Sequence, residues 1–367
     1  MANSYYQTIT KPKLYVSYPL WQYANGALDD IETNYNISDG DTYVAPDQDL
    51  IRMIQLDPSK ITKLYPDDNQ PFSVNKYKIL PKEDNFTNVI DSGLWNFDYM
   101  AILGHNFASA NAKVVIQAAD ANGSVLDIET SNIVNHNPHG VCEFDGWSLF
   151  NLDTKPQNNS HNFRFCFTNN GQGSYGELPL KVGSIMWGKV YEFPQNADLS
   201  ETISFDYGIT QKKTISGKTI SQANFTKPNN WITEPFGLTE ATVGERGDNF
   251  QRRSGIRTWD ISFDSLAPEK VMNQLIMMNS NGWTAQENHS HHGENNESDY
   301  NINNGIDFYT NIVNRSINGH LPMMLQIDAD DPSPQNFAIV RMDSKSFKIT
   351  QKTPNLYNIK LKLTEQI

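Results

Sequence analysis

The sequence lacks most of the features that would identify a common reaction or a membrane location. Its only cysteines are Cys142 and Cys166, too few for a disulfide framework or a four-cysteine zinc site, so both are expected to be buried thiols. No apolar run approaches the ~20 residues that a membrane-spanning helix needs. The first residues also lack the basic start and apolar core of a signal peptide. We therefore expect synthesis in a cytoplasm and no membrane insertion.

Charge is also scarce, and its sign disfavours a nucleic-acid partner. Only 19% of the 367 residues are charged, and the formal net charge is -13. Phosphate backbones are bound by clustered Lys and Arg, so nucleic acid is not an expected partner. The polar surface must come instead from Asn, Ser, Thr and Gln, which favour turns and strand exteriors. The composition and length together predict a mainly β protein with two or three domains.

Residues 1–84 are predicted to form an irregular, extended N-terminal arm. Prolines recur from Pro12 to Pro81 and interrupt any helix. Two short apolar pieces, at 13–16 and 50–54, are predicted to be edge or augmenting strands rather than part of a core. Such an arm would wrap around its own chain or reach a neighbouring subunit.

Strands of alternating polarity, separated by turn-rich stretches, predict two β-sandwich or barrel-like domains in the rest of the chain. The first covers residues 85–195 and the second residues 196–367. The expected strands lie at 100–104, 113–118, 162–167, 185–187, 202–207, 257–263, 337–342 and 357–365.

The second domain is also expected to contain one or two short helices. The stretch 267–278 has Pro268 and Glu269 in its first turn and an apolar face formed by Val271, Leu275 and Met278. A shorter helix is predicted at 306–314. In the last strand Ile359 and its alternate neighbours should face the core, while the lysines between them face water or a partner.

Residues 182–219 resemble a recurring segment of tailed-bacteriophage tail proteins, in which an apolar strand ends in Trp-Gly and the chain enters a second β-domain. Here Trp187-Gly188 ends the strand. Residues 94–107, with Gly104-His105-Asn106 at a strand end, resemble the opening of discoidin-like, galactose-binding-type sandwiches found in phage structural proteins. The order of strands, helix, loop, helix and final Lys/Leu strand is similar to the C-terminal domain of tail-tip and baseplate-associated proteins.

The resemblance implies a non-enzymatic virion structural protein of the tail tip, baseplate or fibre-attachment region. Its partners would be other virion proteins and further copies of itself in a homo-oligomeric ring. A second hypothesis is a receptor-binding module that holds a host glycan, with His105 and Asn106 at the ligand. A third is a hydrolase of envelope polysaccharide, although no Gly-rich phosphate loop, Gly-x-Ser-x-Gly elbow or His-Glu-x-x-His helix is present.

Two groups of residues are candidates for subunit contacts. Aromatic side chains in a Pro-flanked loop often anchor protein interfaces, and a concentrated basic patch suits carboxylates on an adjacent subunit. The candidate interface residues are Trp231, Phe236, Arg246, Arg252, Arg253 and Arg257.

No cofactor is expected. A few groups of residues are candidates for a metal site, and the alternative interpretation is that they lie in solvated surface loops. The sharpest group is His289, His291 and His292, which an extended loop would present to an ion such as zinc. A second set is His136, His139, Cys142 and Glu143, at spacings that match no known metal signature. The acidic stretch 328–332 reads as a turn, with calcium as the alternative.

Overall fold

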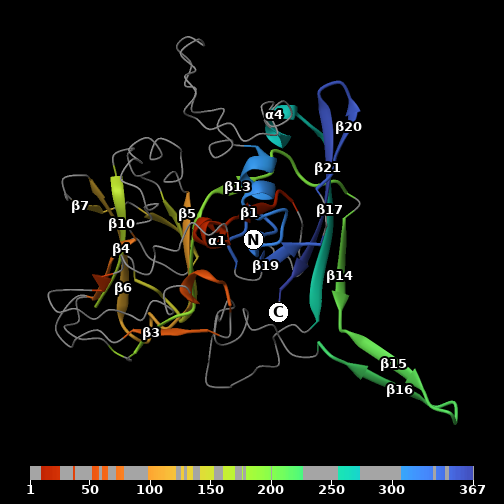
Figure 1. The fold of residues 1–367 in the computed structure, drawn as a ribbon, viewed down its shortest axis with the longest axis horizontal. Coiled ribbons are helices and arrows are strands. Elements are labelled where there is room, and N and C mark those ends of the chain that lie inside the picture. The colour runs from red at the N-terminus through yellow and green to blue at the C-terminus, as the bar shows by residue number, and fades with distance from the viewer. Residues whose placement is uncertain are drawn as a thin grey trace, which may run out of the picture.

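The computed structural model of this protein is mainly β, and every strand pairing that it describes is antiparallel (Figure 1). This confirms the predicted fold class. The structure describes residues 10–24, 36–37, 52–57, 60–64, 72–77, 98–120, 125–127, 130–134, 141–152, 160–169, 176, 179–199, 201–225, 255–272, 307–333, 336–343 and 347–366.

Three larger sheets organise these residues. The large sheet contains, in spatial order, β13 (Val190–Glu192), β1 (Lys13–Tyr15), β18 (Met323–Gln326), β19 (Phe337–Met342), β21 (Leu356–Glu365), β17 (Ile256–Leu266) and β14 (Thr202–Asp206), with β20 (Ile349–Thr353) paired to β21. The central sheet contains β12 (Ser184–Gly188), β5 (Tyr99–His105), β9 (Gly146–Leu152) and β8 (Thr130–Val134). The outer sheet contains β2 (Asn36–Ile37), β4 (Phe72–Tyr77), β10 (Ser160–Asn169), β6 (Ala112–Asp120) and β7 (Val125–Asp127).

Two ribbons and three short helices also belong to the described part of the chain. The ribbons are β3 (Thr62–Leu64) with β11 (Leu180–Val182), and β15 (Ile209–Lys213) with β16 (Thr219–Ala223). The helices are α1 (Tyr18–Ala24), α4 (Pro268–Val271) and the π-helix η5 (Tyr309–Asn314). Among the described residues, none of the helices has the length and apolar character that crossing a membrane would require.

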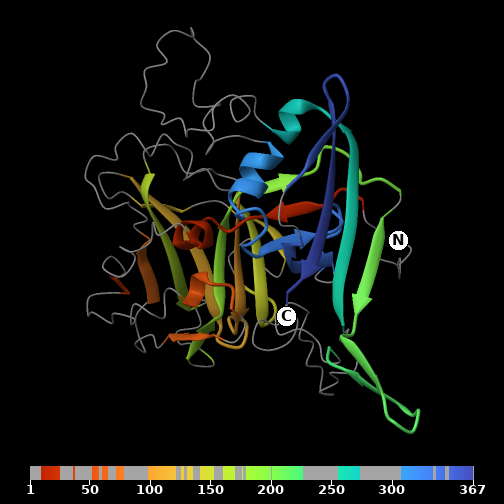
Figure 2. The same cartoon turned by 45° about the vertical axis from the view of Figure 1, so that its right-hand side comes forward.

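The central sheet is buried on both of its faces. Every residue of β5 and β12 is buried, which is unusual for antiparallel strands that have one face in water. Both views place this sheet between the large sheet and the outer sheet (Figures 1 and 2). The chain therefore stacks in three layers, and the near-continuous apolar sequence of β5 follows from its position in the middle.

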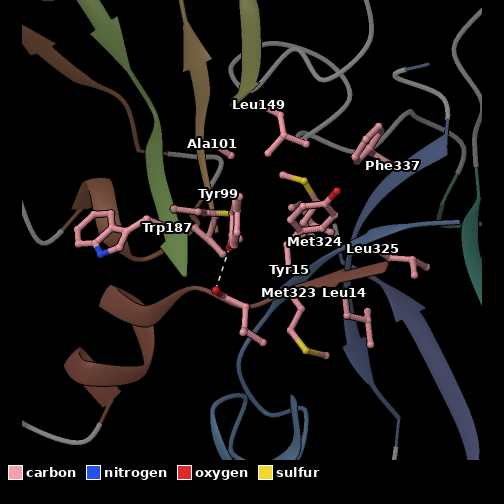
Figure 3. Packing of buried hydrophobic residues seen from close by; sticks show 14 of the residues in the cluster. Leu14, Tyr15, Tyr99, Ala101, Leu149, Trp187, Met323, Met324, Leu325 and Phe337 are labelled. Carbon is pink, nitrogen blue, oxygen red and sulfur yellow. Dashed lines mark hydrogen bonds between the residues drawn. The ribbon is translucent and has the colours of Figure 1, made fainter. Parts of the chain in front are cut away.

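A joint core holds the central sheet against the large sheet (Figure 3). Tyr15 of β1 meets Tyr99 of β5 edge to face at 4.9 Å between ring centroids, and Trp147 of β9 meets Phe337 of β19 in the same way at 5.0 Å. The Tyr99 hydroxyl donates to the Val16 carbonyl oxygen at 2.9 Å. These residues belong to one hydrophobic cluster. Residues from each of the predicted segments 1–84, 85–195 and 196–367 contribute to it.

The strand predicted at 13–16 is present but, contrary to what the sequence had suggested, it is neither at a sheet edge nor outside the core. Strand β1 lies inside the large sheet, paired with β13 on one side and β18 on the other, and Leu14 and Tyr15 are buried. Pro19 sits in the first turn of α1, where its missing N–H is tolerated, instead of preventing a helix. The strand predicted at 50–54 is also wrong, because residues 52–54 form a helical turn with Met53 and Ile54 buried.

The strands with the clearest alternation lie where they were predicted, whereas the helices are shorter. In β21 Ile359, Leu361 and Leu363 are buried and Lys360 and Lys362 are exposed, as expected. Helix α4 ends at Val271, because Met272 takes an extended conformation, so the prediction of a helix to 278 is wrong at Met272 and lies outside the described residues beyond it. The helix predicted at 306–314 is confirmed from Tyr309 to Asn314.

Candidate functional site

The most unusual surface of the described chain is a two-stranded hairpin that leaves the body at the end of β14. We call residues 207–225 the arm. Strands β15 and β16 pair over five residues on each side, from Ile209 opposite Ala223 to Lys213 opposite Thr219, and every one of these residues is exposed. Figures 1 and 2 show the ribbon extending away from all three layers. The arm thus has neither face buried.

The strands form because the sequence is rich in β-branched and small polar residues, and the turn is closed by local bonds. Within the turn Thr214 N donates to the Lys218 carbonyl oxygen at 2.8 Å, and Lys218 N donates to Thr214 Oγ1 at 3.1 Å. Gly217 supplies the positive φ, 79°, that the turn requires. The turn holds the two strands in register, yet an isolated two-stranded hairpin is only marginally stable in water. A surface that covers the arm would therefore stabilise it.

The root of the arm is more tightly fixed than its tip. The carbonyl oxygen of Tyr207 accepts from the backbone N–H groups of Asn224 and Phe225, both at 3.0 Å, and Gly208 N donates to Asp206 Oδ1 at 2.7 Å. Gly208 has a φ of 58°, and a Cβ there would lie 2.7 Å from the Phe225 ring. The chain therefore needs glycine at this position to leave β14 in the observed direction.

We expect Gly208→Ala to loosen the root, because it adds a left-handed backbone penalty of about 1–2 kcal/mol and a clash with Phe225. Backbone hydrogen exchange at Asn224 and Phe225 should accelerate. Gly217→Ala is the matched control, since it has the same kind of positive φ but no atom within 4 Å of the added Cβ, and it should affect the tip alone. Equal exchange at the root in both variants would contradict this role of Gly208.

The arm is basic and carries apolar side chains in water. It contains Lys212, Lys213 and Lys218 and no acidic residue, although the whole chain has 42 acidic and 29 basic residues. None of the three lysines forms an ion pair with another described residue. Ile215 at the tip is fully exposed, at 111%, and Ile220 is exposed at 57%. The tip thus exposes the apolar side chain of Ile215 between the positive charges of Lys213 and Lys218.

A surface of opposite charge lies just before β14. We call Asp198, Leu199 and Glu201 the acidic patch. Leu199 is fully exposed, at 106%, while Asp198 is half-buried and its Oδ2 accepts from Ser262 Oγ at 2.8 Å. Partial burial, with a smaller contribution from the Asp198 carboxylate, raises the pKa of Glu201 to about 7. Its Oε1 atom is buried and has no hydrogen-bond partner in the described structure. A cation beside the exposed part of this carboxylate would stabilise the charged form.

Arg257, predicted to face an adjacent subunit, is instead buried inside the large sheet. Its guanidinium group pairs with both carboxylate oxygens of Glu365, with Nη2 to Oε1 at 2.9 Å and Nε to Oε2 at 3.1 Å. It also lies 4.5 Å from the centre of the Trp259 ring. Because β17 and β21 are neighbouring strands, the two residues meet although they are far apart in sequence. The interface prediction for Arg257 is therefore wrong.

His105 and Asn106, the predicted glycan ligands, are both buried and bonded within the chain. His105 Nε2 lies 2.8 Å from Ser148 Oγ, and its Nδ1 accepts from Phe107 N at 3.3 Å. Burial lowers the pKa of His105 to about 4, so the imidazole is neutral. Asn106 donates to the Pro179 carbonyl oxygen and accepts from Lys181 N. These contacts fit the structural role of holding the end of β5 in place.

Cys142 lies beside the same group, with Sγ 3.3 Å from Ser148 Oγ. Burial raises the pKa of its thiol to about 12, so the sulfur stays protonated and unreactive at neutral pH. This confirms the prediction of a buried thiol for Cys142. The side chain of Cys166 lies outside the described residues.

The remaining predicted site residues fall mostly outside the part of the chain that the structure describes. This holds for the interface candidates Trp231, Phe236, Arg246, Arg252 and Arg253, and for the metal candidates His136, His139, His289, His291 and His292. Among the residues that are described, no group of three His, Cys, Asp or Glu side chains could hold an ion. The acidic stretch 328–332 forms a turn, as expected, in which Asp328 Oδ1 accepts from Asp330 N and Thr10 Oγ1.

The arm itself was missed by the sequence reasoning. Its alternation of polar and β-branched residues resembles that of any strand with one face in water, and only the lack of a large apolar residue at most alternate positions from 209 to 223 distinguishes it. The concentration of lysine without any acidic residue was a second available signal. No family model, curated protein or solved structure matches this chain.

Proposed function

We propose that this chain is a structural protein of a tailed-phage virion, which assembles through subunit contacts in the tail tip, baseplate or fibre-attachment region. The observation that carries the proposal is the arm, a fully exposed ribbon anchored to a rigid, three-layered body. A hairpin without a buried face contributes nothing to the core of its own chain, so its value lies in contact with another molecule. The phage setting rests on the resemblance of residues 182–219 to tail proteins.

The continuous core of the described residues supports the same proposal. One hydrophobic cluster spans residues from Leu14 to Leu363, so the three layers would move as a unit. A rigid block with one projecting element suits a repeated contact in a symmetric assembly, where every copy must meet its neighbour in the same way. The glycan-binding alternative receives no support from His105 and Asn106, whose polar atoms already have partners.

The proposal is tested by the mass of the purified full chain in solution. We expect an oligomer by light scattering coupled to size-exclusion chromatography, and a monomer when residues 209–223 are replaced by a short Gly-Ser linker. Thermal unfolding of the shortened chain should be almost unchanged, because the removed strands bury no apolar surface. A full chain that remains a monomer and degrades host envelope polysaccharide would contradict the proposal and favour the hydrolase.

A further inference from the structure

We infer that the arm of one copy of this chain docks on the acidic patch of a second copy, with Lys212, Lys213 and Lys218 opposite Asp198 and Glu201. This inference rests on the proposed assembly function and names the partner and the surface.

Charge complementarity identifies a second copy as the partner. The arm has three lysines and no acidic residue, and removing it from the count leaves the rest of the chain even more negative than its net charge of -13. A basic projection on an acidic protein is attracted to other copies of that protein, which lowers the barrier to encounter. Nucleic acid would also attract lysines, but the acidic body would be repelled from a phosphate backbone.

The acidic patch matches the tip in chemistry. The tip places the exposed Ile215 between lysines, and the patch places the exposed Leu199 between carboxylates. Contact between the two apolar side chains would remove both from water, while each of the two carboxylates would lie near a lysine.

The positions of the two surfaces exclude a contact within one molecule. Strand β14 runs from the patch at its start to the root of the arm at its end, and the arm continues away from the patch (Figures 1 and 2). The patch of the same chain is thus out of reach. Two different surfaces on one chain that fit each other give a head-to-tail contact, which repeats until a ring closes or continues as a filament.

The lysines also indicate how the arm docks. Lys side chains on exposed strands discourage the uncontrolled addition of further strands. An end-on contact would involve the turn at 214–218 together with Lys212 and Lys213 at the adjoining end of β15. It uses the charges of the arm and leaves its strand edges unpaired with any other strand. The arm is therefore expected to bind a charged surface patch rather than the edge of another sheet.

A charge exchange between two variants tests the inference. The first variant carries Lys212→Glu, Lys213→Glu and Lys218→Glu, and the second carries Asp198→Lys and Glu201→Lys. We expect each alone to lose at least about a hundredfold in self-association, because like charges then face each other. An equimolar mixture should recover the oligomer, since each reversed surface finds its complement on the other variant. The readout is the mass by light scattering.

The control variant carries Lys63→Glu, Lys348→Glu and Lys360→Glu, which reverses three exposed lysines elsewhere and changes the net charge by the same amount as the first variant. It should assemble like the original chain. If the original chain assembles and the mixture of the two variants stays monomeric, the inference is wrong while the proposed function stands. If the original chain does not assemble at all, both fail.

A further measurement separates the nucleic-acid alternative. A labelled DNA duplex is titrated with the original chain and with both variants, and the fluorescence anisotropy is followed. We expect no binding by the original chain at physiological salt. Binding that is lost when the arm lysines are reversed, and kept when the patch is reversed, would overturn the inference in favour of nucleic acid.

Discussion

A chain that lacks residues 1–16 is expected to fail to fold, although the sequence predicted that these residues belong to an irregular, extended segment outside the core. The deletion removes β1 from between β13 and β18 and takes Tyr15 out of the joint core. Loss of one large buried aromatic side chain alone costs about 3–5 kcal/mol. The whole stability of a typical domain is about 5–15 kcal/mol. Far-ultraviolet circular dichroism and thermal unfolding measure the outcome.

The matched control for this prediction removes residues 1–9, which leaves β1 in place. The difference between the melting temperatures of the two shortened chains then measures the contribution of residues 10–16, and we expect it to be large. Within β1, Tyr15→Phe keeps the ring and removes only the hydroxyl that donates to Gln326 Oε1 at 2.6 Å, so it should cost about 1 kcal/mol where Tyr15→Ala costs several. Folding of the 1–16 deletion with an unchanged melting temperature would show that β1 is peripheral after all.

The dependence on β1 also bears on the use of fragments. Residues 85–195 contain the whole central sheet, but one face of that sheet is covered by Tyr15 and Phe337, which lie outside the fragment. The isolated piece would expose Tyr99 and Trp147 to water. Glycan-binding tests should therefore use the full chain.

The fold was predictable from the sequence wherever a strand shows a regular alternation of apolar and polar residues. Strand β21 alternates Ile359, Leu361 and Leu363 with lysines, because one face packs on the core and the other meets water, and this pattern predicted it correctly. Strand β5 was predicted as one of the strands of alternating polarity, yet all of its residues are buried. Its position in a middle layer was not predicted, because a buried strand has the same composition whichever sheets cover it.

The candidate site was hidden for a related reason. A hairpin with two exposed faces has no apolar alternation to mark it, so the arm resembled an ordinary surface strand. Strand β1 has only three residues, and its partners in β18 lie more than three hundred residues away in sequence. Contacts at such separation leave no local pattern, and loop-closure entropy grows too slowly with length to rule them out.

Arg257 shows how the same limit affects a single side chain. It belongs to the one concentrated basic stretch of the sequence, which favoured an exposed position. Its partner Glu365 is 108 residues away and is brought beside it only when β17 and β21 pair. The side chains of Arg257 and Glu365 are 3% and 0% exposed, so the pair is isolated from solvent.

Replacement of Arg257 by alanine is expected to lower the free energy of unfolding by about 3–5 kcal/mol, because it leaves the Glu365 carboxylate buried without its cation. Glu365 would lose both guanidinium donors while the bond from the Arg257 backbone N–H, at 3.0 Å, remains, and the Phe337 carbonyl oxygen would lose a donor. Chemical denaturation of the purified variant gives the value. Lys360→Ala, an exposed change on the neighbouring strand, is the control and should shift it by less than about 0.5 kcal/mol.

A double variant distinguishes two contributions to the free energy of unfolding: the cost of leaving one buried charge unpaired, and the stabilisation that the intact ion pair provides. Arg257→Met with Glu365→Leu removes both charges and refills most of their volume, and replacement of a buried ion pair by apolar residues is often neutral or stabilising. We therefore expect the double variant to be more stable than Arg257→Ala and close to the original chain. If it is instead as unstable as Arg257→Ala, the bidentate contact, the Phe337 carbonyl bond and the packing on Trp259 together contribute stability that apolar packing cannot replace.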